Sequence, residues 1–390
     1  MTIELIKKAS SFGALPINYL QVTDFDYEGD RISGVTCIDL IDKSQLKIKA
    51  KQVVSAGGPW VDKLRAINNS ISNKRLQLTK GVHIVVPYER LPLKQSVYFD
   101  VPDGRMIFAI PRGKVTYIGT TDTVYTGSLD RVVATEKDRD YLLDAVNNTF
   151  PAITLTRYDI ISNWAGLRPL IHEEGKSPSE LSRKDEIFEA SDGLISIAGG
   201  KLTGYRKMSE RIVDKVAKKL SKETGAAFKK SCTKEIALTP EPLLDNKAVR
   251  VYIADVSEQC KQAGIDPHYG WYLVTNYGRQ AANILSALSQ YKGDDQDISI
   301  ALSEVDFCLE HEMVQRAEDF FVRRTGRLYF DILSVAKIKE PVMKRLAEAL
   351  DWSPERLHQE REIMEALIKD ATHYYEHEEV PALIHDVVGE

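Results

Sequence analysis

The segment "LISIAGGKLTGYRKMSERIVDKV", residues 194–216, joins an apolar run to two glycines, a lysine and a threonine, and then to an amphipathic pattern. This order predicts a strand that breaks at Gly199-Gly200 and a helix that begins directly afterwards. Backbone amides at a helix start, beside the fixed cation of Lys201, favour negative charge. The corner is therefore a candidate anion site, although two glycines also make an ordinary tight turn.

A second apolar strand, in "KQVVSAGGPW" (51–60), also runs into glycines. It follows an N-terminal helix and β-rich segments, an order typical of the second half of a dinucleotide-binding domain. A strand that ends at Ala56-Gly57 lets the chain pass close to a dinucleotide, while Pro59 and Trp60 fix its exit. The alternative is a β-bulge before a helix, with Trp60 in the core. No G-x-G-x-x-G stretch follows a strand anywhere in the sequence.

Residues 79–123 predict an antiparallel meander, because apolar or alternating runs are separated by the turn sequences "PDG" and "PRG". Thr135, with an aspartate three residues later, predicts the start of a helix over 136–149. Beyond about residue 235 a 3.6-residue period dominates and predicts helices. One of them is expected to begin at Pro341, because proline is favoured in the first turn.

The composition excludes some classes of protein. The 390 residues are 43% hydrophobic, enough for two or three domains with proper cores. A net charge of -5 with interspersed signs argues against a nucleic-acid binder. The four cysteines are far apart without a C-x-x-C pair, which favours reduced thiols in a cytoplasmic protein over disulfides or a metal site. No apolar run approaches the roughly 18 residues that cross a bilayer, so membrane contact would be peripheral.

Several of these segments together resemble the FAD-dependent glycerol-3-phosphate dehydrogenases of bacteria. The resemblance rests on six strings in the family's order and on one string in the helical region: "KQVVSAGGPWVDKLR", "LTKGVHIVVP", "RMIFAIPRGKVTYIGTTDT", "NWAGLRPLI", "SRKDEI", "SIAGGKLTGYRKMSERIVD" and "EMVQRAEDFFVRRTGRLYF". It implies an α/β plus α fold: an incomplete FAD-binding domain of the glutathione-reductase-like Rossmann type (1–78 and 186–235), an antiparallel-sheet substrate domain (79–185) and a C-terminal helical domain (236–390).

The resemblance also implies roles for particular residues. Arg168 lies in an apolar segment, where a charge is costly unless it is paired or faces a pocket, and it is expected to bind a phosphate and to stabilise the developing alkoxide. Arg183 and Lys201 would assist it, although Arg183 also fits an ordinary surface residue. His83, in the strand "KGVHIVV", becomes the candidate general base, although a lone strand histidine is more often packed.

The flavin side of the site follows from the same resemblance. The residues expected to contact FAD are Ala56, Gly57, Pro59, Trp60, Thr121, Asp122, Gly199, Gly200, Lys201, Leu202 and Thr203. Thr120 to Asp122 form a polar turn after a strand, and the sequence fits either a position near the flavin or hydrogen bonds that hold the loop.

The activity implied is the FAD-dependent oxidation of sn-glycerol 3-phosphate to dihydroxyacetone phosphate, with electrons passed to a membrane quinone. The family's G-x-G-x-x-G segment has no counterpart in the sequence, so we expect a fragment that binds FAD poorly and turns over little. Three alternatives stay open: an oxidase that uses oxygen, an amino-acid-oxidising flavoprotein, and a non-catalytic structural or interaction module. A cytoplasmic protein is expected, peripheral on the inner face of the cell membrane. A homodimer is left open by the sequence.

Overall fold

The computed structural model describes residues 1–172, 185–291, 293 and 295–380, and the chain divides into two compact units. The helical unit comprises Met1–Pro16, Arg112–Val115 and Ala237–Thr372. The sheet unit comprises Ile17–Pro111, Thr116–Ile236 and His373–Glu390. The expected split of residues 1–235 into cofactor-binding and substrate-binding parts stays a prediction.

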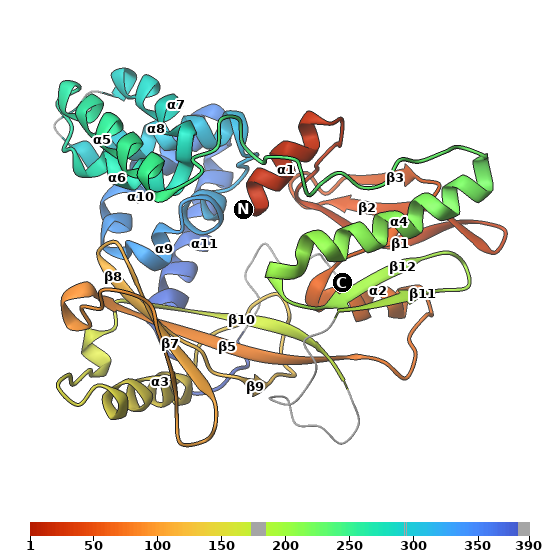
Figure 1. Cartoon of the computed structure of the whole chain (residues 1–390), viewed down its shortest axis with the longest axis horizontal. Helices are drawn as coiled ribbons and strands as arrows, with labels where there is room; N and C mark the ends of the chain where they lie inside the picture. Colours follow the sequence, from red (N-terminus) through yellow and green to blue (C-terminus); the bar gives the residue numbers. More distant parts are fainter. Residues whose placement is uncertain (173–184, 292, 294, 381–390) are drawn as a thin grey trace. The chain divides into compact units, whose positions relative to one another are not determined.

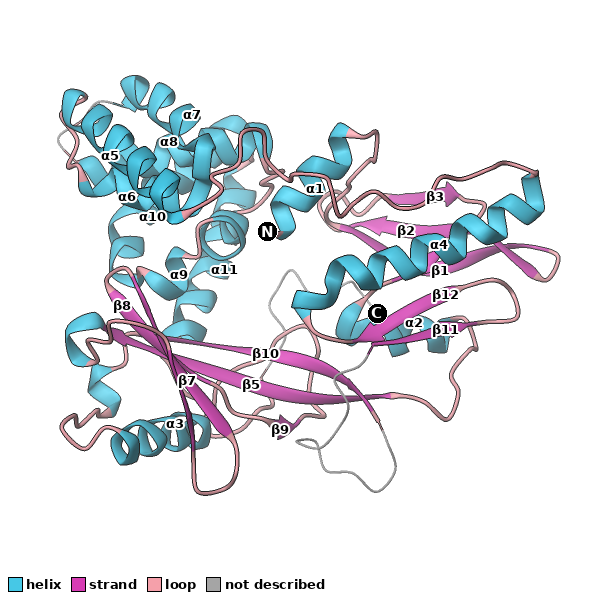
Figure 2. Cartoon of the chain, viewed as in Figure 1, coloured by secondary structure: helices cyan, strands magenta, loops and turns pink. Residues whose placement is uncertain are grey.

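The helical unit is built from α-helices with short 3-10 and π segments between them (Figures 1 and 2). Its elements are α1 (Thr2–Ser11), α5 (Asn246–Gln262), α6 (His268–Tyr277), η5 (Gly278–Gln280), α7 (Ala281–Ala287), η6 (Leu288–Tyr291), α8 (Gln296–His311), η7 (Asp319–Arg324), α9 (Arg327–Phe330), α10 (Ile332–Ala349) and α11 (Pro354–Thr372). The helix start expected at Pro341 is wrong, because α10 begins at Ile332 and contains this proline in its interior.

A buried ion pair with two tyrosine partners lies inside the helical unit. Arg327 donates to Glu304 at 2.5 Å, and the hydroxyls of Tyr272 and Tyr277 donate to the same carboxylate at 2.7 and 2.8 Å. Glu304 is fully buried, and a buried charge is tolerated only when it is paired and hydrogen-bonded. Arg327, which lies in the string "EMVQRAEDFFVRRTGRLYF", therefore has a structural role as the partner of a buried carboxylate.

The sheet unit contains three sheets, with helices packed on two of them. Its strands are β1 (Leu20–Glu28), β2 (Arg31–Asp39), β3 (Gln45–Lys49), β4 (Val54–Ser55), β5 (Leu76–Pro87), β6 (Val97–Asp100), β7 (Met106–Arg112), β8 (Val115–Gly119), β9 (Thr123–Val124), β10 (Ser162–Ile171), β11 (Asp185–Glu189) and β12 (Ile195–Gly199). Its helices are η1 (Gly58–Trp60), α2 (Val61–Ile67), η2 (Tyr88–Arg90), α3 (Glu136–Thr149), η3 (Arg157–Asp159), η4 (Leu202–Gly204) and α4 (Tyr205–Thr224).

The largest sheet has the strand order β10-β5-β8-β7-β6, with β9 paired to β5. The expected meander is confirmed for β6, β7 and β8 only, because β5 lies beside β8 and not beside β6. Alternate residues of β5, namely Val82, Ile84 and Val86, are fully buried in a core cluster that also holds Leu142 and Val146 of α3. The helix α3 runs over the predicted residues, and Thr135 forms the capping box with Asp138. Because side chains alternate along a strand, the other residues of β5 lie on the opposite face, away from this core.

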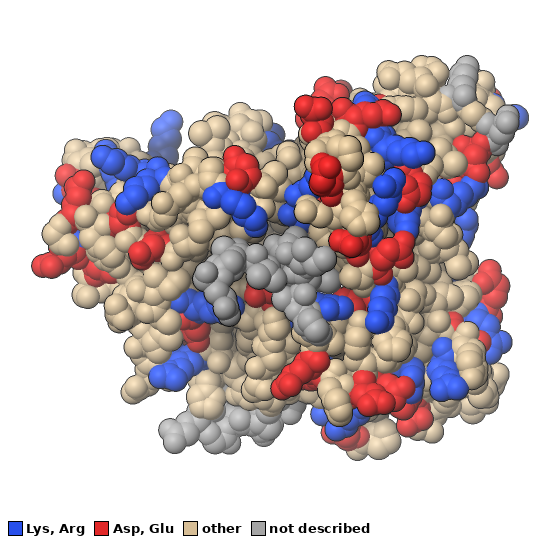
Figure 3. All heavy atoms as spheres, turned by 180° about the vertical axis from the view of Figure 1, so that it is seen from behind, with Lys and Arg blue, Asp and Glu red and all other residues tan. Residues whose placement is uncertain are grey.

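A smaller sheet, ordered β11-β12-β4, carries the two glycine corners. Ile195 and Ile197 of β12 pack against Ile212 of α4, so the amphipathic helix covers one face of this sheet (Figure 2). The strand that breaks at Gly199-Gly200 and the helix that follows it are confirmed, with one 3-10 turn, η4, between them. On the face of the molecule drawn in Figure 3, Lys and Arg side chains are interspersed with Asp and Glu.

Candidate functional site

Two glycine corners lie at one edge of the small sheet. Strands β4 and β12 are parallel, with Val54 opposite Ile195 and Ser55 opposite Ser196. The chain leaves β4 through Ala56-Gly57 and leaves β12 through Gly199-Gly200. Because the carboxyl ends of parallel strands meet at the same edge of a sheet, the two corners are neighbours, in the position where open α/β sheets bind ligands.

The second corner requires glycine and leaves amides uncapped. Gly199 and Gly200 have φ of 75° and 81°, and a Cβ on Gly200 would lie 2.8 Å from the sulfur of Met208. In the described part of the chain, no side chain caps η4 or α4 at its start. The residues expected beside the flavin, Lys201, Leu202 and Thr203, are exposed. This end of the helix is thus open to a negatively charged group.

At the first corner, Ser55 is buried and its hydroxyl has no hydrogen-bond partner within the described residues. Ala56 beside it is exposed, and Pro59 stands inside the short helix η1. The indole of Trp60 donates to Asp130 at 2.8 Å, and its side chain is 39% exposed. Trp60 is therefore a surface residue held by a hydrogen bond, which differs from the core position considered as the alternative.

The second face of the large sheet, opposite the core packed by α3, brings together residues from two strands. The antiparallel pairing of β5 and β10 sets Trp164 opposite His83, and Arg168 opposite Thr79. Directly opposite residues share a face, so the histidine and the arginine lie on the same side of the sheet. Between them the register places two glycines opposite each other, Gly81 and Gly166. The floor between the base candidate and the cation candidate thus carries no side chain.

His83 is held by aromatic rings and close backbone. Its imidazole stacks on Trp164 with 4.6 Å between ring centroids and 11° between planes. Phe108 and Tyr117 lie 5.5 and 6.3 Å away. Gly119 passes so close that a Cβ there would lie 2.2 Å from the imidazole Cδ2. The ring can therefore adopt few orientations.

The protonation of His83 follows from these surroundings. Burial, and then the positive charge of Arg168, lower the pKa of the imidazole from 6.5 to about 4. Its Nδ1 is buried and finds no hydrogen-bond partner in the part of the chain that the structure describes. The side chain is consequently neutral near pH 7.

Arg168 is oriented by the turn after β8. Its guanidinium donates to the carbonyl of Thr121 at 3.1 Å, to the carboxylate of Asp122 at 3.2 Å and to the hydroxyl of Thr120 at 3.0 Å. The hydroxyl of Thr121 in turn accepts from the amide of Val82 at 3.0 Å. Hydrogen bonds thus hold the turn of Thr120 to Asp122, which is one of the two alternatives that the sequence left open. Contact of Thr121 and Asp122 with a flavin stays a prediction.

The two sheets meet inside the sheet unit. Strand β10 contacts β12, and Ile171 packs in one cluster with Ala198 and Val61. Ile171 is three positions along β10 from Arg168, about 10 Å in an extended strand. The convergence of Lys201 with Arg168 and His83 on one subsite stays a prediction. Arg183 lies outside the described residues.

Comparison with known proteins identifies the family of the chain. Residues 1–206 match the family of FAD dependent oxidoreductases, and residues 201–357 match the C-terminal domain of alpha-glycerophosphate oxidase. The aerobic glycerol-3-phosphate dehydrogenase of Bacillus subtilis (strain 168) is 43% identical over 374 residues, which cover 95% of this chain and 67% of the relative. That of Staphylococcus aureus (strain USA300) is 43% identical over 377 residues, covering 96% and 68%.

A solved structure is similar over almost the whole chain. The X-ray structure of the glycerol-3-phosphate dehydrogenase from Bacillus halodurans, complexed with FAD, has a TM-score of 0.84 at 40% identity. The match covers 95% of this chain and 73% of that one. The chain belongs to the family of FAD-dependent glycerol-3-phosphate dehydrogenases. It spans about two thirds of the length of the curated relatives.

In this member of the glycerol-3-phosphate dehydrogenase family, Gly81 makes room for the arginine. A Cβ on Gly81 would lie 2.5 Å from Nη2 of Arg168 and 2.6 Å from Oγ1 of Thr120, whereas a Cβ on the facing Gly166 would meet nothing within 4 Å. We expect Gly81→Ala to lower the free energy of unfolding by about 1–3 kcal/mol through overpacking. Gly166→Ala is the matched control and should stay within about 0.5 kcal/mol of the parent. Urea denaturation of both variants tests this, and equal losses would contradict it.

The lowered pKa of His83 leads to a second prediction, which concerns how the free energy of unfolding depends on pH. An unfolded histidine binds its proton near pH 6.5, whereas the native side chain does so only near pH 4. The unfolded state therefore holds more protons in this window, and native stability falls as the pH falls through it. Between pH 7 and pH 5 this loss amounts to about 2 kcal/mol. Denaturation of the parent and of His83→Asn at both pH values should show a steeper loss for the parent, and equal slopes would refute the assignment.

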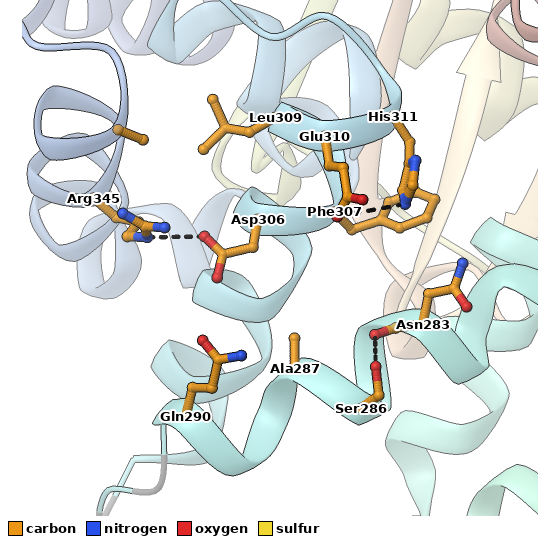
Figure 4. Close-up of a pocket in the computed structure, with 11 residues that line it drawn as sticks. Asn283, Ser286, Ala287, Gln290, Asp306, Phe307, Leu309, Glu310, His311 and Arg345 are labelled. Carbon is orange, nitrogen blue, oxygen red and sulfur yellow. Dashed lines mark hydrogen bonds and ion pairs between the residues drawn. The ribbon is translucent and has the colours of Figure 1, made fainter.

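A separate cavity of about 770 Å³ lies in the helical unit, between α7, α8 and α10 (Figure 4). Arg345 in its lining donates to Asp306 at 2.8 Å, and the imidazole of His311 lies 3.7 Å from the carboxylate of Glu310. None of its lining residues is a candidate from the sequence. In the described part of the chain, no group of three or more His, Cys, Asp or Glu side chains is arranged to hold a metal ion.

Proposed function

We propose that the protein oxidises sn-glycerol 3-phosphate to dihydroxyacetone phosphate with FAD, and that the electrons pass to a membrane quinone. The observation that carries this proposal is the shared sheet face on which the neutral His83 stands next to Arg168, whose guanidinium lies over Gly81. Such a face offers a fixed cation for a phosphate and a base for an alcohol at the two ends of a small molecule.

The small sheet fits FAD. Two glycine corners at one edge, a buried Ser55 hydroxyl without a partner among the described residues, and the uncapped start of η4 and α4 offer close backbone approach and free donors. We infer that Ala56, Gly57, Pro59 and Trp60 line the path of the dinucleotide. Gly199 to Thr203 would then present amides to the flavin, the group that accepts the hydride from the substrate when it is bound. Rossmann topology of the glutathione-reductase type belongs to this proposal.

Arg168 would bind the phosphate. Its hydrogen bonds to Thr120, Thr121 and Asp122 hold the guanidinium against the sheet, and a held guanidinium loses less entropy when it binds an anion. Arg168 would also stabilise charge that develops on the substrate oxygen. Arg183 and Lys201 are proposed as further cations of this subsite.

His83 would take the proton of the alcohol. Oxidation of a secondary alcohol removes a hydride from carbon and a proton from oxygen, and a neutral imidazole nitrogen is the acceptor that the face provides. The positive charge of Arg168 is one cause of the lowered pKa of His83. A bound phosphate dianion would offset this charge, so we infer that substrate binding raises the pKa and makes His83 a stronger base.

Oxygen is the second candidate acceptor, because residues 201–357 match a domain described for an alpha-glycerophosphate oxidase. The purified protein, supplied with excess FAD and sn-glycerol 3-phosphate under air, should turn over slowly, form little hydrogen peroxide and reduce a soluble quinone analogue. Stoichiometric peroxide would favour the oxidase instead.

We propose peripheral contact with an anionic bilayer through α4 and the segment after it. No helix within the described residues is long and apolar enough to cross a membrane. The end of α4 carries Lys218, Lys219 and Lys222, and Val213 and Phe228 are exposed apolar side chains nearby in the sequence. A basic, amphipathic helix of this kind binds anionic lipid surfaces. Sedimentation with phosphatidylglycerol vesicles should retain the protein, and vesicles of phosphatidylcholine alone should not.

A binding experiment tests the proposed function directly. sn-Glycerol 3-phosphate should raise the melting temperature of the protein, because a ligand that binds the native state stabilises it. Glycerol at the same concentration should not, since it lacks the phosphate. With FAD retained, anaerobic addition of the substrate should bleach the flavin absorbance. An equal response to glycerol, or no response to either, would refute the proposal.

A further inference from the structure

A buried lysine lies behind the proposed substrate face. Lys80 stands on β5 between Thr79 and Gly81, and its side chain is only 1% exposed. Its Nζ lies 2.7 Å from a carboxylate oxygen of Asp138 and 2.6 Å from one of Glu378. A buried ammonium is very unfavourable unless it is paired, so these two carboxylates fix its place. The proposed reaction gives this ion cluster no role.

Glu378 belongs to a segment of the sheet unit that follows the last helix, His373–Glu378. Tyr375 accepts a hydrogen bond from the amide of Glu136 at 2.9 Å and donates one to the carbonyl of Ala134 at 3.1 Å. The side-chain amide of Asn163, on β10, donates to the carbonyl of His373 at 3.2 Å. The segment is thus hydrogen-bonded both to the start of α3 and to the strand that carries Arg168.

A short series of hydrogen bonds leads from Lys80 to the arginine. The hydroxyl of Thr121 donates to the carbonyl of Lys80 at 3.4 Å and accepts from the amide of Val82 at 3.0 Å. The carbonyl of Thr121 accepts from Nη1 of Arg168 at 3.1 Å. The backbone of β5 at Lys80 therefore sets the position of Thr121, and Thr121 sets the position of the guanidinium.

We propose that the segment His373–Glu378, through the ion pair of Glu378 with Lys80, positions Arg168 for the phosphate of the substrate. Glu378 and Lys80 are positioning residues, because their side chains lie on the core side of β5 and act through its backbone. The inference rests on the proposed function, in which Arg168 binds the phosphate. It adds to the site a segment that lies roughly three hundred positions after Lys80 in the sequence.

The variant Glu378→Gln tests the inference. Glutamine keeps the shape of the side chain but leaves Lys80 with Asp138 as its remaining carboxylate. We expect the dissociation constant for sn-glycerol 3-phosphate, measured by calorimetry, to rise about threefold to tenfold. Hydrogen exchange of the Val82 amide should become faster, because its acceptor Thr121 is less firmly held. Glu378→Asp keeps the charge and should restore most of the affinity.

Two controls separate positioning from a general loss of stability. Glu376→Gln removes the same charge from an exposed position in the same segment. It should change neither the dissociation constant for sn-glycerol 3-phosphate nor the hydrogen exchange of the Val82 amide. Asn147→Ala removes hydrogen bonds to Leu155 within the sheet unit, outside the series that leads to Arg168. It should lower the melting temperature and leave the dissociation constant as in the parent.

The outcomes are distinguishable. If the parent protein binds no sn-glycerol 3-phosphate, the proposed function fails and this inference with it. If the parent binds and Glu378→Gln binds equally well, with unchanged exchange at Val82, the function stands and the positioning role is wrong. If Asn147→Ala weakens binding as much as Glu378→Gln does for the same loss of melting temperature, the segment has a structural role alone.

Discussion

Replacing Arg168 by leucine should lower kcat/KM for sn-glycerol 3-phosphate about 100-fold to 1000-fold. The guanidinium lies on the same face of β5 and β10 as the histidine and is held by three hydrogen bonds. Its loss removes charge-assisted hydrogen bonds to the phosphate and leaves Asp122 to repel the substrate. Most of the effect should appear in KM, because the phosphate is bound in the ground state as well as the transition state.

Arg168→Lys gives the graded comparison. Lysine keeps the charge but cannot donate simultaneously to Thr120, Thr121 and Asp122 in the same planar arrangement, so an intermediate loss is expected. Arg157→Gln is the control, since Arg157 is exposed and contacts its neighbour Tyr158. Steady-state kinetics of the three variants measure this, and a leucine variant with parental KM would remove Arg168 from the substrate site.

His83→Asn should lower kcat about 100-fold to 10,000-fold, the range typical of a lost general base. Asparagine is neutral, as His83 is near pH 7, so the fold should tolerate it. KM should change little, because the proton is transferred only in the chemical step. The rate of the variant should rise with pH, as hydroxide replaces the missing base.

His172→Asn is the matched control for this variant. His172 follows β10 and is exposed, with a contact to Gln77. It should keep parental kcat. If His83→Asn also keeps parental kcat, the imidazole is a packing partner of Trp164 and another group takes the proton.

Local signals in the sequence predicted the local structure well. The capping residues Thr135 and Asp138 fixed the start of α3, because the cap involves atoms only three residues apart. The glycine pair at 199 and 200 marked the end of β12, because the backbone there needs positive φ. Pro341 misled the assignment. A helix interior can contain proline when packing on both sides outweighs one lost hydrogen bond, and Ile338 and Val342 beside it are fully buried.

The set of residues that lie with His83 on one face of β5 and β10 could be predicted only in part. The resemblance pointed to His83 and Arg168, and the strand register then placed them together. The stacking of Trp164 on His83, and the glycine floor of Gly81 and Gly166, depend on which strand pairs with which and in what register. No single strand carries that information, since register is set by tertiary packing. The contact of Lys80 with Glu378 could not be predicted from the sequence either, because tertiary packing alone brings these two distant residues together.

The account's central claim is that Arg168 and His83 act on one bound molecule of sn-glycerol 3-phosphate. Nuclear magnetic resonance of the imidazole, with and without the substrate, tests it most directly. The account predicts a pKa of about 4 in the free protein and a clear rise on binding, because the phosphate dianion offsets the charge of Arg168. A pKa near 6.5 in the free protein, or a pKa that sn-glycerol 3-phosphate leaves unchanged, would contradict it.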